Sequence, residues 1–339
     1  MSNIFPSYAL VHPSYVMPEP VIQYNQASGA FDLLAGRDPI VRLGSEDKFV
    51  YAKVLNIRTK TAAGQHAANQ LPSCTVAASM VSTPTYLVRS RAEYDHHDIA
   101  AGGAWNVSVP EAQRLGMRQA HFQQARVANL YGFNPANGEG IVNAQGATSV
   151  SLPPDTNGNS TVGTYDNGQL AQFLLAQIAA AKVRCMQMGL PVRIEVCGPQ
   201  RVLAQMEYQG IVQPTSYQRP GAGTATVKGT VQAILELNDD ELGWNYDDTL
   251  QAQGANGADL VIVTIPEVKL PKGRTLNTNV FAELQPNTQA TTLMFCDMAA
   301  PREIPTPMAG GAIDVVTEWR ITSGWGLRPE AITLISMFP

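Results

Sequence analysis

The chain has 339 residues, of which only 15% are charged, compared with about 25% in an average soluble domain. Apolar residues make up an ordinary 45%, and 23 glutamines and 18 asparagines take the place of the missing charge. This composition excludes intrinsic disorder, and no apolar run reaches the roughly 18 residues of a membrane-spanning helix. The net charge of −5 argues against a protein that grips nucleic acid through its phosphates.

The N-terminal stretch predicts an extended arm over residues 1–36. It has neither the basic nor the apolar block of a secretory signal, and its four prolines favour extended backbone. The four cysteines are widely spaced and form no CxxC pair, so the sequence predicts no zinc cluster, no disulfide framework and a reduced compartment. The four prolines are Pro6, Pro13, Pro18 and Pro20, and the four cysteines are Cys74, Cys185, Cys197 and Cys296.

A long hairpin is the first regular feature that we expect. Residues 48–58 alternate in polarity, which predicts a strand with Phe49, Tyr51, Leu55 and Ile57 on one face. Residues 75–91 form a second β-prone run, and the small, polar segment between the two runs predicts a flexible tip. Pro84 lies inside the second run, and a proline fits an edge strand better than a central one.

Two helices are expected in the middle of the chain. Ser108 and Glu111 have the spacing of a capping box and open a helix that runs to Tyr131, followed by loop over residues 133–165. A better patterned helix covers about 167–188 and ends before Gly189. A strand over 192–196 and a third helix from Pro199 follow.

Strands dominate the rest of the sequence. Helices and strands are therefore segregated rather than regularly alternating, which is an α+β pattern and not a doubly wound one. The strands are predicted at residues 230–237, 260–265, 292–296, 313–322 and 332–337.

Candidate catalytic groups are few. The run Asp95, His96, His97 and Asp98 has the side chains of a metal site, which leaves open a metal-dependent α+β hydrolase, but no partner motif accompanies it and neighbouring strand residues point to opposite faces. A solvated loop is the alternative interpretation. The acids at 239–241 and 247–248 lack the alternating pattern of a calcium loop. No cofactor is expected.

Charge is distributed unevenly along the chain. Residues 229–268 hold eight acids and no Lys or Arg, whereas the first hairpin strand is rich in bases. This asymmetry is either a local fluctuation or a sign that a basic hairpin meets an acidic lobe between neighbouring copies, because complementary potentials set the register of an interface. The hypothesis places Lys53, Arg58 and Lys60 opposite Asp239, Asp240, Glu241, Asp247 and Asp248.

The order of these elements resembles that of tailed-bacteriophage major capsid proteins with the HK97-like fold, in a divergent branch. Leu130-Tyr131-Gly132 followed by Gly140-Ile141-Val142-Asn143 is similar to that family's aromatic-Gly step and Gly-Leu-Asn. Pro191-Val192-Arg193-Ile194 before Pro199 resembles the opening of its axial domain. The ending from Gly324 to Ile332 resembles its closing strands.

The resemblance implies four regions. Residues 1–36 would be the N-terminal arm and 45–98 the E-loop hairpin. Residues 99–163 and 301–325 would form a peripheral domain around a spine helix at about 108–131. Residues 164–300 and 326–339 would form the axial domain.

The resemblance also implies a function, which is not enzymatic. The chain would self-assemble into pentamers and hexamers of an icosahedral head that encloses double-stranded DNA without sequence-specific binding. Portal, scaffolding and decoration proteins would be its partners, no membrane would be involved, and it would end up in the virion after assembly in the bacterial cytoplasm. An encapsulin-type shell is the alternative within the same fold.

Overall fold

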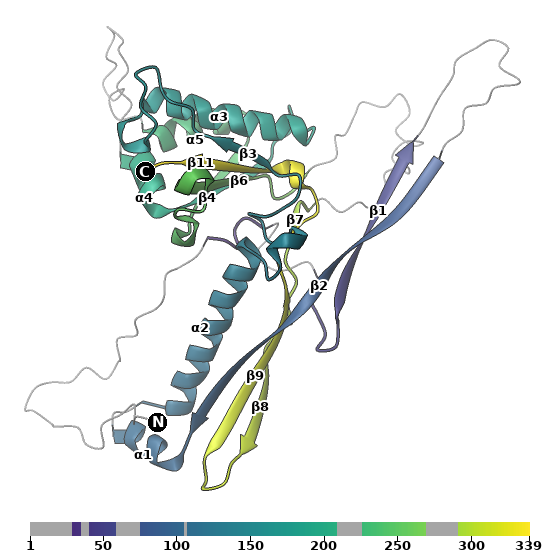
Figure 1. Cartoon of the computed structure of the whole chain (residues 1–339), viewed down its shortest axis with the longest axis vertical. Coiled ribbons are helices and arrows are strands. Elements are labelled where there is room, and N and C mark those ends of the chain that lie inside the picture. The colour runs from purple at the N-terminus through teal and green to yellow at the C-terminus, as the bar shows by residue number, and fades with distance from the viewer. Residues whose placement is uncertain (1–28, 35–40, 59–74, 105–106, 209–225, 269–290) are drawn as a thin grey trace, which may run out of the picture.

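The chain forms a compact body, built on a five-stranded sheet, and an elongated part in which a long helix lies along a second sheet (Figure 1). Of the predicted N-terminal arm, the structure describes only a short turn, in which Leu33 is fully buried. The described residues are 29–34, 41–58, 75–104, 107–208, 226–268 and 291–339.

The α-helices are α1 (His96–Ala104), α2 (Val109–Leu130), α3 (Asn167–Arg184), α4 (Gln200–Tyr208) and α5 (Val227–Glu236). The first strands are β1 (Phe49–Arg58), β2 (Thr75–Tyr94), β3 (Thr148–Ser151), β4 (Arg193–Gly198) and β5 (Glu241–Tyr246). The later strands are β6 (Asp259–Thr264), β7 (Leu293–Met294), β8 (Arg302–Pro307), β9 (Ile313–Thr322), β10 (Trp325–Gly326) and β11 (Ile332–Met337).

The compact body is a layered structure with its sheet in the order β3-β11-β6-β4-β5. Every residue of the central strand β6 is buried, because helices cover one sheet face and the end of α2 covers the other. A strand buried on both faces reads as a continuous apolar run, which explains the sequence Leu-Val-Ile-Val. The helices α3, α4 and α5 supply the covering layer of the first face.

Helix α3 follows its predicted pattern but ends early. Asp166 caps its N-terminus by accepting a hydrogen bond of 2.9 Å from the backbone N–H of Gln169. Leu170, Leu174 and Ile178 lie on the buried face, as the helical spacing predicts. The helix ends at Arg184 rather than near 188, because Met186 adopts left-handed backbone with φ of 56°.

The strand predicted at 230–237 is wrong, since these residues belong to helix α5. Thr226 caps this helix through a 3.1 Å hydrogen bond from the N–H of Gly229. Val227, Val231 and Leu235 are spaced four residues apart and lie on the buried face. Helical packing against α3 thus overrides the β propensity of the valines and isoleucine.

The predicted hairpin is confirmed in the elongated part, whose sheet has the order β1-β2-β9-β8. Strand β2 is 20 residues long and changes partner halfway. Residues 75–84 pair with β1, and residues 85–94 pair with β9. Pro84 is the last residue paired with β1 and has no partner in β9, so its missing N–H removes no hydrogen bond from the β9 side.

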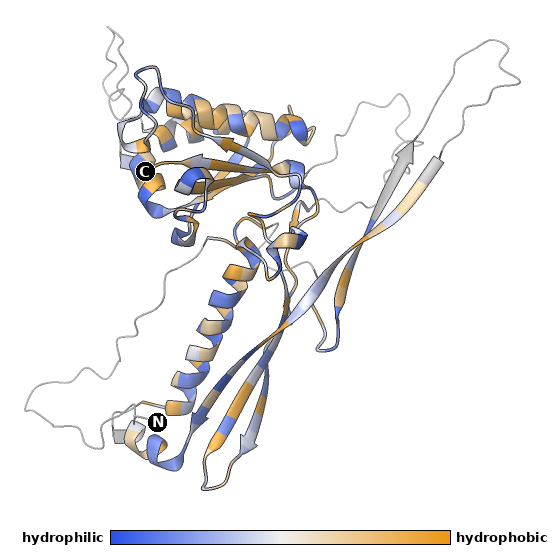
Figure 2. Cartoon of the chain, in the orientation of Figure 1, coloured by the Kyte–Doolittle hydropathy of each residue, from blue (hydrophilic) through white to orange (hydrophobic). Residues whose placement is uncertain are grey.

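Helix α2 packs lengthwise on β2 and β9 (Figures 1 and 2). Ser108 occupies its N-cap position with extended backbone, but the side chain makes no capping hydrogen bond, so the predicted capping box is wrong. Pro110, in the first turn, fits a position where no intrahelical N–H is needed.

Residues 148–163, which the capsid resemblance places in one domain with α2, lie instead on the compact body. Strand β3 pairs in parallel with β11, and Leu152 and Val162 join the core beneath α3. The compact body therefore includes residues 148–163 and does not begin at 164.

The two parts meet at the C-terminal end of α2. The N–H groups of Ile141 and Val142 donate to the carbonyls of Asn129 and Leu130, both at 3.0 Å, and close the last turn of the helix. Gly140 donates to the carbonyl of Gly324 at 2.8 Å, while Gly324 donates to Ala128 at 3.0 Å. Three motifs that carry the capsid resemblance thus converge on one junction.

Hydropathy along the described helices gives no membrane-spanning candidate: none combines the necessary length with the necessary apolar character.

Candidate assembly surfaces

The ribbon, which we define as β1 and residues 75–84 of β2, projects from the junction as two strands (Figure 1). Within the part of the chain that the structure describes, these strands pair only with each other. At its base, Val50 is buried against Leu43 and Cys296. The opposite face carries Phe49, Tyr51 and Met80, whose exposed fractions are 53%, 62% and 68%. Large apolar side chains that share one exposed face are typical of a surface that binds a partner.

Lys53 lies on the same face as these apolar side chains, because its register partner is Met80 and Tyr51 is two residues away. It is exposed. Arg58 ends β1 and pairs in register with Thr75, while Lys60 lies outside the described residues. Of the three bases in the hypothesised cluster, the structure therefore shows only Lys53 to be exposed. The exposure of Arg58 and Lys60 remains a prediction.

The five acids of the hypothesised acidic lobe do not share one surface. Asp240 is buried, and its carboxylate accepts hydrogen bonds from the Lys182 ammonium at 2.6 and 2.8 Å and from the Val192 N–H at 3.0 Å. Asp247 is also buried and caps the turn at Thr249, accepting at 3.0 Å from its N–H.

Asp248 acts within the chain as well, since it accepts a 2.7 Å hydrogen bond from the N–H of Gln200 at the start of α4. Asp239 and Glu241 are exposed. The inclusion of Asp240 and Asp247 in a contact surface is thus corrected, because buried carboxylates with partners of their own are not offered to a neighbour. The sequence pattern shows the charge but not the turns that bury it.

The cluster at 95–98 forms the start of α1 and not a loop. Asp95 accepts a 2.8 Å hydrogen bond from the N–H of Asp98, and Asp98 accepts one of 3.3 Å from the N–H of Asp95. The N–H of Asp98 lowers the pKa of the Asp95 carboxyl. His96 and His97 are exposed. Across the described part of the chain, no group of three or more His, Cys, Asp or Glu residues is placed to hold a metal ion.

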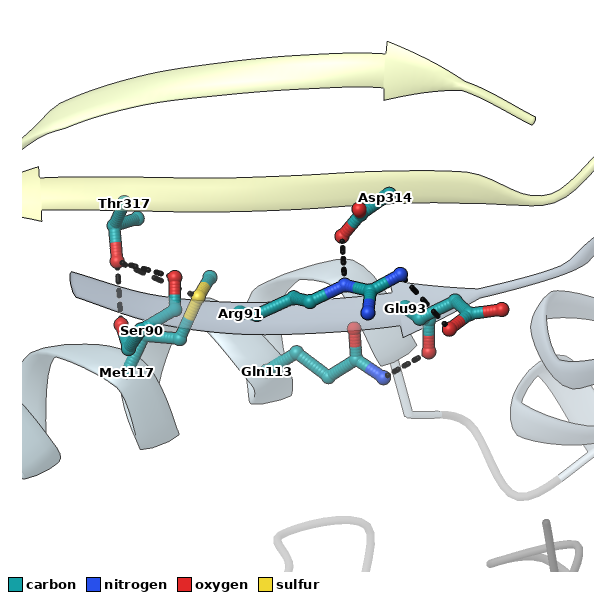
Figure 3. Close-up of polar contacts among 7 residues, drawn as sticks. All are labelled: Ser90, Arg91, Glu93, Gln113, Met117, Asp314 and Thr317. Carbon is teal, nitrogen blue, oxygen red and sulfur yellow. Dashed lines mark hydrogen bonds and ion pairs between the residues drawn. The ribbon is translucent and has the colours of Figure 1, made fainter.

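The sheet face away from α2 carries a ladder of exposed ion pairs. Arg89 lies 2.8 Å from Glu318. Arg91 lies 2.9 Å from Asp314, as Figure 3 shows. Both arginines are more than half exposed, so each pair contributes little free energy of folding. The ladder joins β2 to β9 and keeps this face polar.

A histidine of α2 is buried against the other face of this sheet. His121, on α2, has Nε2 at 3.1 Å from the Ser90 hydroxyl and 3.4 Å from that of Thr317, and its ring stacks on Trp319. Figure 3 shows Ser90, Thr317 and Met117 meeting between the helix and the two strands. His121 Nδ1 is buried without a hydrogen-bond partner. No sequence motif marks this lone histidine, because its burial follows from packing alone.

Acidification is expected to weaken this contact between α2 and the sheet. Burial lowers the pKa of His121, so the folded protein holds the neutral ring and protonation opposes folding. The contribution of neutral His121 to the free energy of unfolding should be fully present above the ordinary histidine pKa of about 6.5. This contribution should be lost as the pH falls from there through the lower pKa of the folded protein. Urea unfolding of H121Q should lose this slope, whereas H96Q, which changes an exposed histidine, should keep it. An unchanged slope in H121Q would contradict the assignment.

Comparison with known proteins separates sequence from fold. No protein-family model and no curated protein sequence matches the chain. Solved structures do match. A chain from the capsid of Myoviridae phage XM1 superposes with a TM-score of 0.68 over 97% of this chain and 99% of that one, at 9% identity.

Two further structures agree. A chain from the capsid of the native GTA particle gives a TM-score of 0.60 over 97% and 96% of the two chains, at 10% identity. A chain of Microbacterium phage Oxtober96 gives 0.57 over 96% of each, also at 10%. The chain has the HK97-type fold of phage capsid proteins. The predicted α+β class is confirmed with it.

The HK97-type fold explains why ribbon, long helix and compact body occur together. The superpositions cover almost the whole chain, so they include the ribbon as well as the layered body. At identities near 10%, the likeness lies in the arrangement of elements and not in shared side chains. The side chains on the surfaces described above are therefore not inferred from these relatives and are explained from the residues of this chain.

Proposed function

We propose that the protein is a major capsid protein whose copies assemble into pentamers and hexamers and close an icosahedral head around the double-stranded DNA of a tailed phage. Its role is structural and not enzymatic. The observation that supports this most is the HK97-type fold along 97% of the chain, ribbon included. A subunit that carries an uncovered two-stranded ribbon gains stability for it only from neighbours.

The regional assignments follow from this proposal. The ribbon corresponds to the E-loop, α2 to the spine helix, the β2-β9-β8 sheet with α2 to the peripheral domain, and the compact body to the axial domain. Residues 1–36 would be the arm. Portal, scaffolding and decoration proteins are the partners that such a head requires, and the protein would reside in the virion after assembly in the bacterial cytoplasm.

The composition is consistent with a container. A net charge of −5 provides no strong grip on phosphates, so DNA can enter and leave the head. Amide-rich, charge-poor surfaces suit interfaces between copies, because burying a charge costs more free energy than burying an amide that forms hydrogen bonds.

Electron microscopy of the purified protein tests the proposal. We expect closed shells of uniform diameter at high protein concentration. Dispersed monomers at every protein concentration and ionic strength would refute it. Nuclease-protected double-stranded DNA inside particles from infected cells would distinguish a phage head from an encapsulin-type shell, which would hold protein cargo instead.

A further inference from the structure

A groove lies between α3 and α5 on the compact body, and these two helices do not touch the ribbon of the same chain (Figure 1). Its volume is about 300 Å³, at the lower limit for ligand pockets, so it has room for one or two large side chains. The walls are apolar, and the ion pair of Lys182 and Asp240 lies among its lining residues. The groove is lined mainly by Leu175, Ile178, Leu190 and Ile234.

Large apolar side chains surround this groove in solvent. Met186, Met188 and Leu237 are 81%, 61% and 85% exposed. Met186 has a φ of 56° because it closes the end of α3, where the N–H of Gln187 donates to the carbonyl of Lys182 at 2.7 Å. The exposed apolar side chains around the α3/α5 groove, and not this backbone conformation, give it the properties of a docking surface.

The edge of the groove is acidic. Glu236, Asp239 and Glu241 are exposed there, at the end of α5 and the start of β5, next to the groove residues Asn238 and Asp240. The sequence has no Lys or Arg between 229 and 268 to neutralise them. A segment that fits this groove should combine apolar anchors with positive charge.

The ribbon has that combination. Phe49, Tyr51 and Met80 present apolar anchors on one face, and Lys53 lies on the same face. Ribbon and groove do not touch within one chain, because the described ribbon stands clear of α3 and α5 (Figure 1). A contact between unlike surfaces of two identical copies is heterologous and closes rings when the rotation permits.

We propose that the ribbon of one copy docks its exposed apolar face into the α3/α5 groove of a second copy, with Lys53 facing the acidic edge. This proposal rests on shell assembly and assigns the surface that receives the ribbon. The docking proposal keeps Asp239 and Glu241 from the charge hypothesis. The apolar groove takes the place of the buried acids Asp240 and Asp247 as the contact surface. The same contact covers the exposed apolar side chains of the ribbon face and those around the α3/α5 groove.

Disulfide trapping between copies tests the pairing. Met80→Cys and Met188→Cys are introduced together in a Cys74→Ser background, where the three described native cysteines are buried. The control pairs Met80→Cys with Ser160→Cys, an exposed site near the opposite end of α3. After oxidation of assembled particles with copper phenanthroline, we expect multimer ladders at least about tenfold stronger for the first pair, because docking raises the local thiol concentration.

The outcomes are distinguishable from failure of the shell itself. If wild-type protein forms no particles, the proposed function fails. If particles form but the two pairs cross-link equally, or not at all, the docking assignment is overturned. Cross-links that appear equally in dissociated subunits would overturn it as well.

Charge reversal provides a second readout. Changing Lys53, Arg58 and Lys60 to glutamate should lower particle yield about fivefold or more at low salt and less at high salt, because exposed pairs are screened. Adding Asp239→Lys and Glu241→Lys to this variant should restore the yield. Failure of this rescue, with monomers still folded, would show that the ribbon faces a different surface.

Discussion

Replacing Gly140 by alanine is expected to lower the free energy of unfolding by about 2–5 kcal/mol, a large effect for the addition of one methyl group. Gly140 has a φ of 88°, where a side chain is strained, and its new Cβ would overlap the carbonyl carbon of Tyr131. The overlapping atoms are backbone, so no side-chain rotation relieves the clash. The substitution would push residues 140–142 away from the end of α2.

The matched control for this variant is Gly116→Ala, in the same protein and on α2 itself. Gly116 is exposed, and nothing lies within 4 Å of the Cβ that alanine would add. Alanine should therefore stabilise the helix by up to about 1 kcal/mol. Urea unfolding of both variants measures the contrast. Similar midpoints for the two variants would show that the junction does not depend on the missing Cβ.

This junction explains why the sequence motifs of the capsid resemblance exist. The aromatic-Gly step at 131–132 ends α2, and the glycine at 140 brings a second segment against that end. Gly324 approaches so closely that a Cβ there would overlap the carbonyl oxygen of Asn129. In the sequence these motifs are far apart, and nothing in their order shows that they contact one another. The structure unites them, because helix carbonyls without intrahelical partners need N–H donors from elsewhere in the chain.

Local patterns predicted the hairpin, α2, α3 and the last strands because in each of them one periodicity dominates. The pattern failed at α5, where valines and an isoleucine favour a strand locally and only packing on α3 selects the helix. It also failed to place the acids of 240 and 247. Charged residues are usually solvated, so the sequence favours the surface for both. Their burial depends on Lys182 and on turn N–H groups that contact them only in the folded chain.

The exposed ribbon and the α3/α5 groove illustrate the same limit for the candidate surfaces. Alternation places Phe49 and Tyr51 on one face, but it does not state whether that face is covered. Only the partner change of β2 at Pro84 shows that no third described strand joins the ribbon. The groove requires residues from α3, α5 and the turn after α3, and the strand predicted at 230–237 would have removed one of its walls.

Replacing Asp240 by leucine is expected to lower the free energy of unfolding by about 3–5 kcal/mol, because it leaves the Lys182 ammonium buried without a counter-charge. The side chains of Lys182 and Asp240 are only 9% and 1% exposed, so water does not replace the lost partner. The Val192 N–H also loses its acceptor at the entry to β4. Lys182→Met should lower the free energy of unfolding by less, because the Asp240 carboxylate still accepts the hydrogen bond from the Val192 N–H.

The double variant, K182M with D240L, decides how the pair acts. It removes both charges together, so its stability should exceed that of D240L alone, and only the Val192 N–H remains unsatisfied, at about 1–3 kcal/mol. Urea unfolding of the wild type, both single variants and the double variant measures the coupling free energy. Strictly additive losses would mean that Asp240 acts through Val192 alone. A positive coupling would show that Lys182 and Asp240 hold α3 against the start of β5, and so fix the width of the α3/α5 groove, before any second copy binds there.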